Sequence, residues 1–108
     1  MNEKINERVL ITGASSGIGL ELAREFARNG HPLVIVAPIH EEIDAVANQI
    51  QEEFGTEITS LAADLSREDS PQFIFDALQE RGLDVHILVN NAGRGQKGEF
   101  AIVPLEGD

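Results

Sequence analysis

The sequence of 108 residues has 8 Lys and Arg against 19 Asp and Glu, which gives a formal net charge of −11 at pH 7. This acidic balance argues against a nucleic-acid partner, because phosphate neutralisation requires clustered basic side chains. The sequence has no cysteine, which excludes disulfide scaffolds, thiolate zinc sites and cysteine nucleophiles. No apolar run approaches the roughly 20 residues of a membrane helix, and the first residues fit neither a secretory signal nor a transit peptide. We therefore expect a single cytoplasmic domain over residues 1–108 with neither a membrane nor a nucleic acid as partner.

A short strand, a glycine turn and a helix are predicted at the start of the chain. Residues 8–12 form a β-rich apolar run that stops at Gly13, and apolar side chains then recur at helical spacing. Gly30 stands where this helix, over roughly residues 18–29, should end, because glycine adopts left-handed backbone geometry at low cost. The chain therefore opens with strand, glycine turn and helix, in that order.

The rest of the chain alternates strands with helices. Strands are expected at residues 33–37, 57–62 and 85–89, and helices at about 41–54 and 70–82. The run 33–37 is apolar without alternation, which is typical of a strand buried on both faces of a parallel sheet. Ser70 and Pro71 have the form of an N-cap followed by proline in the first helical position. Four aromatic side chains are expected to belong to helices packed on the sheet: Phe26, Phe54, Phe73 and Phe75.

The order of these elements predicts an α/β fold. Right-handed crossovers turn four strands and three helices into a doubly wound, Rossmann-type parallel sheet with strand order 3-2-1-4. Residues 94–108 are interrupted by glycine and proline, so they should be loop-rich, with at most a short apolar piece at 100–103. The apolar fourth strand would then form a bare edge, which favours association. This edge suggests a missing second half of the sheet or self-association.

The glycine turn has the residues that a phosphate-binding loop needs. Gly13 allows a sharp turn out of the strand, Gly17 leaves room for a diphosphate, and Gly19 allows close packing of helix on strand. The amino end of the helix supplies N–H groups and a partial positive charge, while Ser15 and Ser16 add hydroxyl donors. The alternative is an ordinary turn with a helix cap, which is less consistent with the complete strand–turn–helix context.

Three motifs together resemble one enzyme family. The Gly-x-x-x-Gly-x-Gly turn, Asp64-Leu65 after the third strand and Asn90-Asn91-Ala92-Gly93 after the fourth are similar to those of the short-chain dehydrogenase/reductase family, in its amino-terminal half only. The resemblance implies NAD(P)-dependent oxidoreduction of alcohols and carbonyls. It implies that the adenine amino group meets Asp64 and that the ribose meets the asparagine motif, although Asp64 could be a turn acid and the asparagines could only close a loop. The implied cofactor-binding residues are Gly13, Ser15, Ser16, Gly17, Ile18, Gly19, Asp64, Leu65, Asn90, Ala92 and Gly93.

The segment after the second strand departs from this family. A carboxylate there bonds the ribose 2′-hydroxyl of NAD, whereas an arginine receives the 2′-phosphate of NADP. This chain has Ala37-Pro38-Ile39-His40, and Glu41 and Glu42 lie too far into the next helix to be assigned as hydroxyl partners. His40 could contribute as a cation at low pH. The overall resemblance favours NADP over NAD.

The catalytic residues of the family are also missing from the sequence. The family's proton donor is a tyrosine followed four residues later by lysine, beyond the asparagine motif, and this chain has no tyrosine. Its three histidines are too far apart for a metal site and offer no substitute acid or base. We therefore predict the cofactor-binding portion of such a reductase or dehydrogenase, inactive by itself. The alternative is a non-catalytic nucleotide-binding or interaction module.

Overall fold

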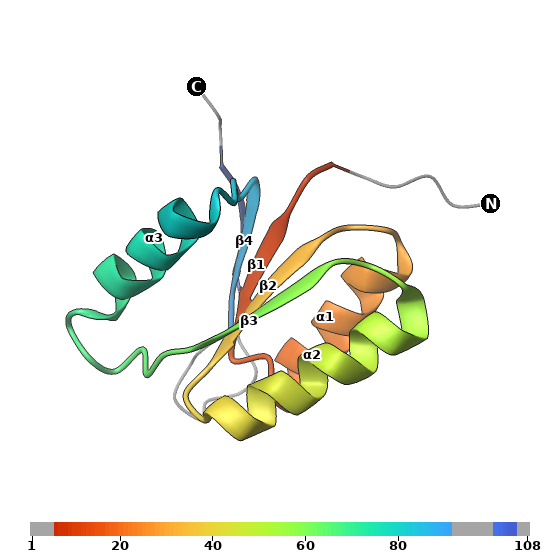
Figure 1. The fold of residues 1–108 in the computed structure, drawn as a ribbon, viewed down its shortest axis with the longest axis horizontal. Coiled ribbons are helices and arrows are strands. Elements are labelled where there is room, and N and C mark those ends of the chain that lie inside the picture. Colours follow the sequence, from red (N-terminus) through yellow and green to blue (C-terminus); the bar gives the residue numbers. More distant parts are fainter. Residues whose placement is uncertain (1–5, 92–100, 106–108) are drawn as a thin grey trace.

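The predicted alternation of strands and helices is present in the computed structural model, which describes residues 6–91 and 101–105 (Figure 1). The elements, in chain order, are β1 (Val9–Thr12), α1 (Gly17–Arg28), β2 (Leu33–Ala37), α2 (His40–Phe54), β3 (Ile58–Ala62), α3 (Ser70–Arg81), β4 (Ile87–Asn90) and β5 (Ala101–Pro104). The four predicted strands and three predicted helices are confirmed, with ends that shift by up to two residues. No helix in the described part of the chain is both long enough and apolar enough to cross a membrane.

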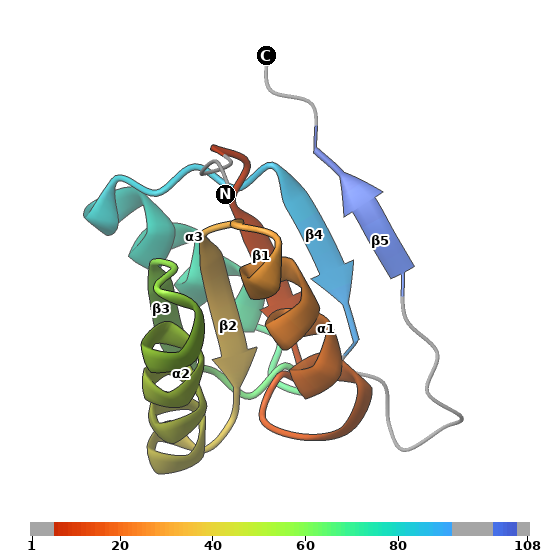
Figure 2. The ribbon, with the colours of Figure 1, turned by 90° about the vertical axis from the view of Figure 1, so that its right-hand side faces the viewer.

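The sheet has one strand more than the sequence predicted. Its order is β3-β2-β1-β4-β5, with β5 antiparallel to β4 and Asn90 paired with Ala101 (Figure 2). The predicted four-strand order is therefore incomplete, and the prediction of a loop-rich 94–108 is wrong over Ala101–Pro104. The apolar piece there is only four residues long, so its periodicity could not distinguish a strand from a loop. The edge of the sheet is β5, and the predicted bare edge at β4 is wrong.

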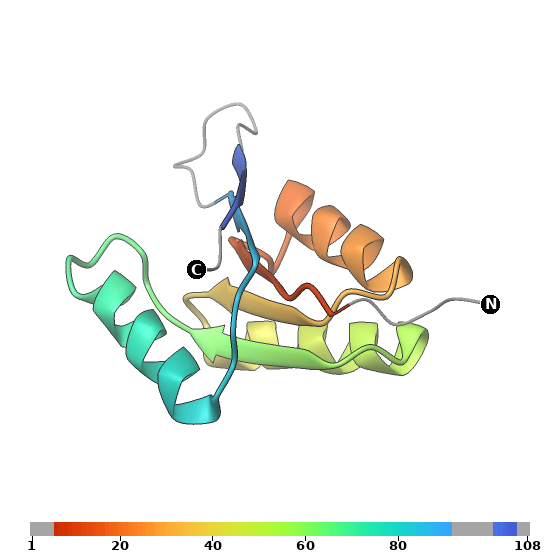
Figure 3. The same cartoon turned by 90° about the horizontal axis from the view of Figure 1, so that it is seen from above.

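Helices cover the two faces of the sheet unequally. The sheet lies between α3 on one side and α1 with α2 on the other (Figure 1), and the same separation is visible from above (Figure 3). All five residues of β2 are buried, as expected of a strand covered on both faces. Each fully buried Val, Leu or Ile side chain contributes about 1.5–3 kcal/mol of transfer free energy. The core beneath α1 and α2 includes Val9, Ile11, Leu33, Ile35, Ile43 and Ile50, and the core beneath α3 includes Leu10, Val34, Val36 and Leu61.

The amino end of α3 differs from the sequence prediction, and its aromatic side chains are exposed. Asp69 occupies the N-cap position, so the prediction of Ser70 as the N-cap is wrong by one residue. Phe73 and Phe75 belong to a helix packed on the sheet, as expected, but their own side chains are 51% and 54% exposed. The contacts to the core come from Ile74, Ala77 and Leu78, because these side chains share the face of α3 that points to the sheet.

Candidate functional site

The β1–α1 turn lies at the carboxyl end of the central strand. The chain builds β2 and β3 on one side of β1 and then crosses to place β4 on the other side. The neighbouring connections leave the sheet on opposite faces, because α1 and α3 lie on opposite sides (Figure 1). In open α/β sheets this reversal of strand order is where ligands bind, beyond the carboxyl ends of the strands. The fold therefore places the glycine turn at the expected ligand-binding position.

Gly13 and Gly19 hold the first turn of α1 close to the end of β1. Gly13 has a φ of 64°, in the left-handed region that favours glycine. A Cβ atom on Gly19 would lie 2.0 Å from the carbonyl oxygen of Gly13 and 2.6 Å from Nδ2 of Asn91. No side chain fits at Gly19 without displacing backbone. The amino end of α1 is therefore fixed directly above the strand.

Gly17 has open space around it. Its φ is 61°, and a Cβ atom built on it would meet no described atom within 4 Å. The exposed Ser16 occupies the N-cap position, and its side chain makes no capping hydrogen bond to the residues that the structure describes. The first intrahelical bond runs from the Leu20 N–H to the Ser16 carbonyl, at 3.3 Å. The N–H groups of the helix before Leu20 have no helical carbonyl one turn back that could accept their hydrogen bonds. Together they form an arrangement that suits an anion.

No acidic residue lies in the first turn of α1. A carboxylate there would stabilise the helix end, but it would also occupy the N–H groups and repel an anionic ligand. Ile18 is 41% exposed. The first turn of α1 therefore carries no charged side chain, and Ser16, Gly17 and Ile18 are exposed to solvent.

Thr12 and Asn91 connect β1, β4 and the glycine turn. The Asn91 N–H donates to Oγ1 of Thr12 at 2.8 Å, and Nδ2 of Asn91 donates to the carbonyl of Gly13 at 3.3 Å. Oγ1 of Thr12 also lies 3.4 Å from Oδ1 of the exposed Asn90. The sequence placed Asn90 in the site but gave no role to Thr12, and only its place at the end of β1 could have indicated one. Ala92 and Gly93 lie outside the described residues.

Replacing Thr12 with valine is expected to lower the free energy of unfolding by about 1–3 kcal/mol, because the N–H of Asn91 loses its acceptor. Thr56→Val is the matched control. The Thr56 hydroxyl donates to the Ala27 carbonyl, which also accepts from the Gly30 N–H. This carbonyl keeps a partner in the variant, so the loss should be smaller. Urea denaturation of both variants checks the difference, and equal losses would contradict the role of Thr12.

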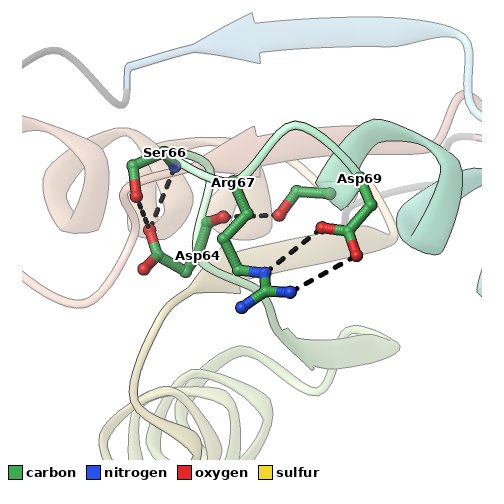
Figure 4. A network of polar contacts seen from close by, with 5 residues as sticks. Asp64, Ser66, Arg67 and Asp69 are labelled. Atoms are coloured by element: carbon green, nitrogen blue, oxygen red, sulfur yellow. Dashed lines mark hydrogen bonds and ion pairs between the residues drawn. The ribbon is translucent and has the colours of Figure 1, made fainter.

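Asp64 shapes the loop that follows β3 (Figure 4). Its Oδ1 accepts hydrogen bonds from the N–H of Ser66 at 3.0 Å and from the Ser66 hydroxyl at 2.7 Å. Its carbonyl accepts the N–H of Arg67 and the hydroxyl of Ser70. These contacts match the interpretation of Asp64 as a turn acid, and its contact with adenine stays a prediction. The half-buried Leu65 lies beside it.

Arg67 and Asp69 pair across the same loop (Figure 4). Nε of Arg67 lies 3.2 Å from Oδ1 of Asp69. The hydrogen bond and the positive charge of Arg67 lower the pKa of the Asp69 carboxyl below its ordinary value. The pair therefore keeps the Asp69 carboxyl ionised to a lower pH than that of an unpaired aspartate.

The described residues of the predicted site lie along one edge of the sheet. The glycine turn touches Asn91 directly, whereas Asp64 and Leu65 follow β3, with β2 between β3 and β1. Because these strands are parallel, their carboxyl ends share an edge. A ligand that contacts both groups must be extended along that edge.

Comparison with known proteins identifies the family. The short chain dehydrogenase family model matches residues 7–106. The very-long-chain 3-oxoacyl-CoA reductase of Homo sapiens is 34% identical over 91 residues, covering 82% of this chain and 28% of that protein. L-Sorbose reductase from Gluconobacter frateurii, solved with NADPH and L-sorbose, has 33% identity and a TM-score of 0.79 over 89% of this chain and 37% of that chain. A short-chain dehydrogenase from Sphingobium yanoikuyae in complex with NADPH has 45% identity and a TM-score of 0.73 over 85% of this chain and 36% of that chain.

These relatives are longer than the chain, which covers only the stated 28% to 37% of each. The matched region includes the glycine turn, the loop after β3 and the asparagine motif after β4. The likeness therefore extends over all the elements that build the carboxyl edge of β1, β2, β3 and β4. The chain belongs to the short-chain dehydrogenase family of oxidoreductases.

Proposed function

We propose that this chain is the dinucleotide-binding portion of an NAD(P)-dependent oxidoreductase that interconverts carbonyls and alcohols. The observation that carries the proposal is the accessible amino end of α1, held on β1 by Gly13 and Gly19 and left open at Gly17. Two structures with the same architecture were solved with NADPH, which supports a nicotinamide dinucleotide as ligand. A bound nicotinamide would supply hydride transfer.

The residues of the carboxyl edge fit a dinucleotide. The N–H groups of Gly17, Ile18 and Gly19 suit the diphosphate, since a helix amino end offers both donors and partial positive charge. The same site includes Ser15 and Ser16 as hydroxyl donors. Asp64 and Leu65 are proposed to meet the adenine, and Asn90, Ala92 and Gly93 the ribose. The extended shape of a dinucleotide matches the spread of these residues along the edge.

The chain by itself is proposed to bind cofactor without turnover. The sequence has no tyrosine, and a carbonyl needs a proton donor within hydrogen-bond reach of its oxygen. The likeness to NADPH complexes supports NADP as the preferred cofactor. Cytoplasmic location stays a prediction.

Calorimetric titration of the 108-residue chain with NADPH and NADH tests this function. We expect saturable 1:1 binding of NADPH, weaker binding of NADH, and no oxidation of NADPH with a ketone substrate, followed by its absorbance. Absence of binding by both nucleotides would contradict the proposal, and turnover proportional to protein would contradict the inactivity.

An interaction module is the second candidate. The observation that favours it is the apolar edge strand β5, where Ile102 is 50% exposed and Val103 is 40% exposed. Apolar edge strands favour pairing with another chain. Sedimentation of the same titrated sample separates the two functions, because concentration-dependent self-association without nucleotide binding would favour the module.

A further inference from the structure

His40, Asp44 and Ser60 form a chain of contacts at the amino end of α2. Nε2 of His40 lies 3.4 Å from Oδ2 of Asp44. The Ser60 hydroxyl donates to Oδ1 of the same carboxylate at 2.5 Å. His40 begins α2, Asp44 lies one turn later, and Ser60 belongs to β3. The carboxylate is therefore fixed by the sheet on one side and holds the imidazole on the other.

This chain of contacts begins shortly after β2, the strand whose carboxyl end the glycine turn contacts. The Ala14 N–H donates to the Val36 carbonyl at 3.2 Å, so the turn rests on the end of β2. Only Pro38 and Ile39 separate β2 from His40. In folds of this type, the side chain after the second strand contacts the ribose at its 2′ position. His40 is the first residue after β2 whose side chain can donate or accept a hydrogen bond.

Residues 29–66 offer a 2′-phosphate no basic side chain other than histidine. The sequence has no lysine or arginine between Arg28 and Arg67. His31, the other histidine of this segment, precedes β2, and its Nδ1 lies 2.9 Å from the Glu7 carbonyl at the opposite end of the strand. An imidazole carries at least one N–H in every protonation state and can therefore donate to a phosphate oxygen. His40 is the basic group between β2 and β3 that meets this requirement, and Arg67, in the loop after β3, is paired with Asp69.

We propose that His40 recognises the 2′-phosphate of NADP(H) and that Asp44 competes with the phosphate for the imidazole. This inference rests on the proposed function. The His40 side chain is 71% exposed and that of Asp44 is 44% exposed, so the imidazole has room to turn from the carboxylate to a ligand. Ser60 keeps Asp44 in place when the imidazole leaves. The two residues therefore act on NADP(H) affinity in opposite directions.

The acidic side chains of α2 strengthen this competition. Glu41 and Glu42 are exposed in the first turn of the helix, and Asp44 follows them. Like charges repel, and at physiological salt this repulsion is effective within about 8 Å. A phosphate at the ribose 2′ position therefore meets unfavourable charge that the imidazole N–H must offset. A 2′-hydroxyl, which is uncharged, does not meet this repulsion.

Calorimetric titration of three proteins with NADPH and with NADH tests the inference. His40→Ala is expected to lower NADPH affinity about tenfold, because a hydrogen bond to a charged group is lost. Asp44→Asn should raise NADPH affinity about threefold, because it removes the competing carboxylate charge near the phosphate. NADH affinity should stay unchanged in both variants. If His40 and Asp44 only stabilise the start of α2, each variant should instead change its affinities for NADPH and NADH together.

Glu52→Gln, near the other end of α2, is the control for net charge. It removes one negative charge as Asp44→Asn does, and it should leave the ratio of NADPH to NADH affinity unchanged. An unchanged ratio in His40→Ala, or parallel changes for both nucleotides, would overturn the role of His40. A ratio in Asp44→Asn that rises no more than in Glu52→Gln would overturn the competition. If either result is found while all variants still bind NADH, the proposed function stands. If the unaltered chain binds neither nucleotide, the inference and the proposed function are both overturned.

Discussion

Replacing Gly19 with alanine is expected to remove a large part of the stability of the chain. The new Cβ would lie 2.0 Å from the carbonyl oxygen of Gly13 and 2.7 Å from its carbonyl carbon. These are backbone atoms at the end of the central strand, so relief requires α1 to move away from β1. We expect a loss of about 3 kcal/mol or more. Small domains unfold with only about 5–15 kcal/mol. Urea denaturation followed by circular dichroism measures the loss.

Gly82→Ala is the control for alanine at a glycine position. Gly82 has a φ of 66°, and a Cβ built there meets no described atom within 4 Å. Its variant should lose only about 1–2 kcal/mol, the cost of left-handed geometry for a residue with a side chain. Should Gly19→Ala be as stable as Gly82→Ala, the close approach of α1 to β1 would not be present in solution.

Replacing Gly17 with alanine is expected to lower dinucleotide affinity about tenfold or more, because a methyl group would enter the space where the diphosphate approaches the backbone. The bare protein has no described atom within 4 Å of this methyl position, so no steric contact there accounts for a loss of stability. The left-handed φ of 61° still costs about 1–2 kcal/mol. Calorimetry with NADPH gives the affinity, and urea denaturation gives the stability of the same sample.

Gly55→Ala separates the effect on the ligand from the effect on the backbone. Gly55 has a φ of 72° and the same open surroundings, but it lies at the carboxyl end of α2. The two variants should lose similar stability, while only Gly17→Ala loses affinity. Equal affinities of Gly17→Ala and Gly55→Ala for NADPH would show that the turn at Gly17 starts a helix but does not bind the dinucleotide.

Local patterns were sufficient to predict most of the fold. The unbroken apolar run of β2 predicted a strand buried on both faces, and all its residues are buried. Glycines marked where helices end, and Gly55 and Gly82 adopt left-handed geometry there. These features depend on the residues within one element, so they could be read without knowledge of the neighbours.

Features that depend on contacts between distant elements were missed. Strand β5 forms only because β4 presents an edge, and four residues do not give that information. The exposure of Phe73 and Phe75 depends on which neighbours cover α3, which helical periodicity does not contain. In the candidate site, the glycine turn could be predicted from its spacing. The connections of Thr12 with Asn91 and of His40 with Asp44 required coordinates.

The central position of β1 has a consequence for the synthesis of the chain. Its partner β2 follows at once after α1, whereas its other partner, β4, comes only after α2, β3 and α3. While a ribosome delivers the intervening residues, one side of β1 keeps unpaired backbone groups. The asparagine that ties β4 to the glycine turn arrives after β4. The candidate site is therefore incomplete until β4 has been made, and a nascent chain that stops earlier leaves one side of the central strand β1 unpaired.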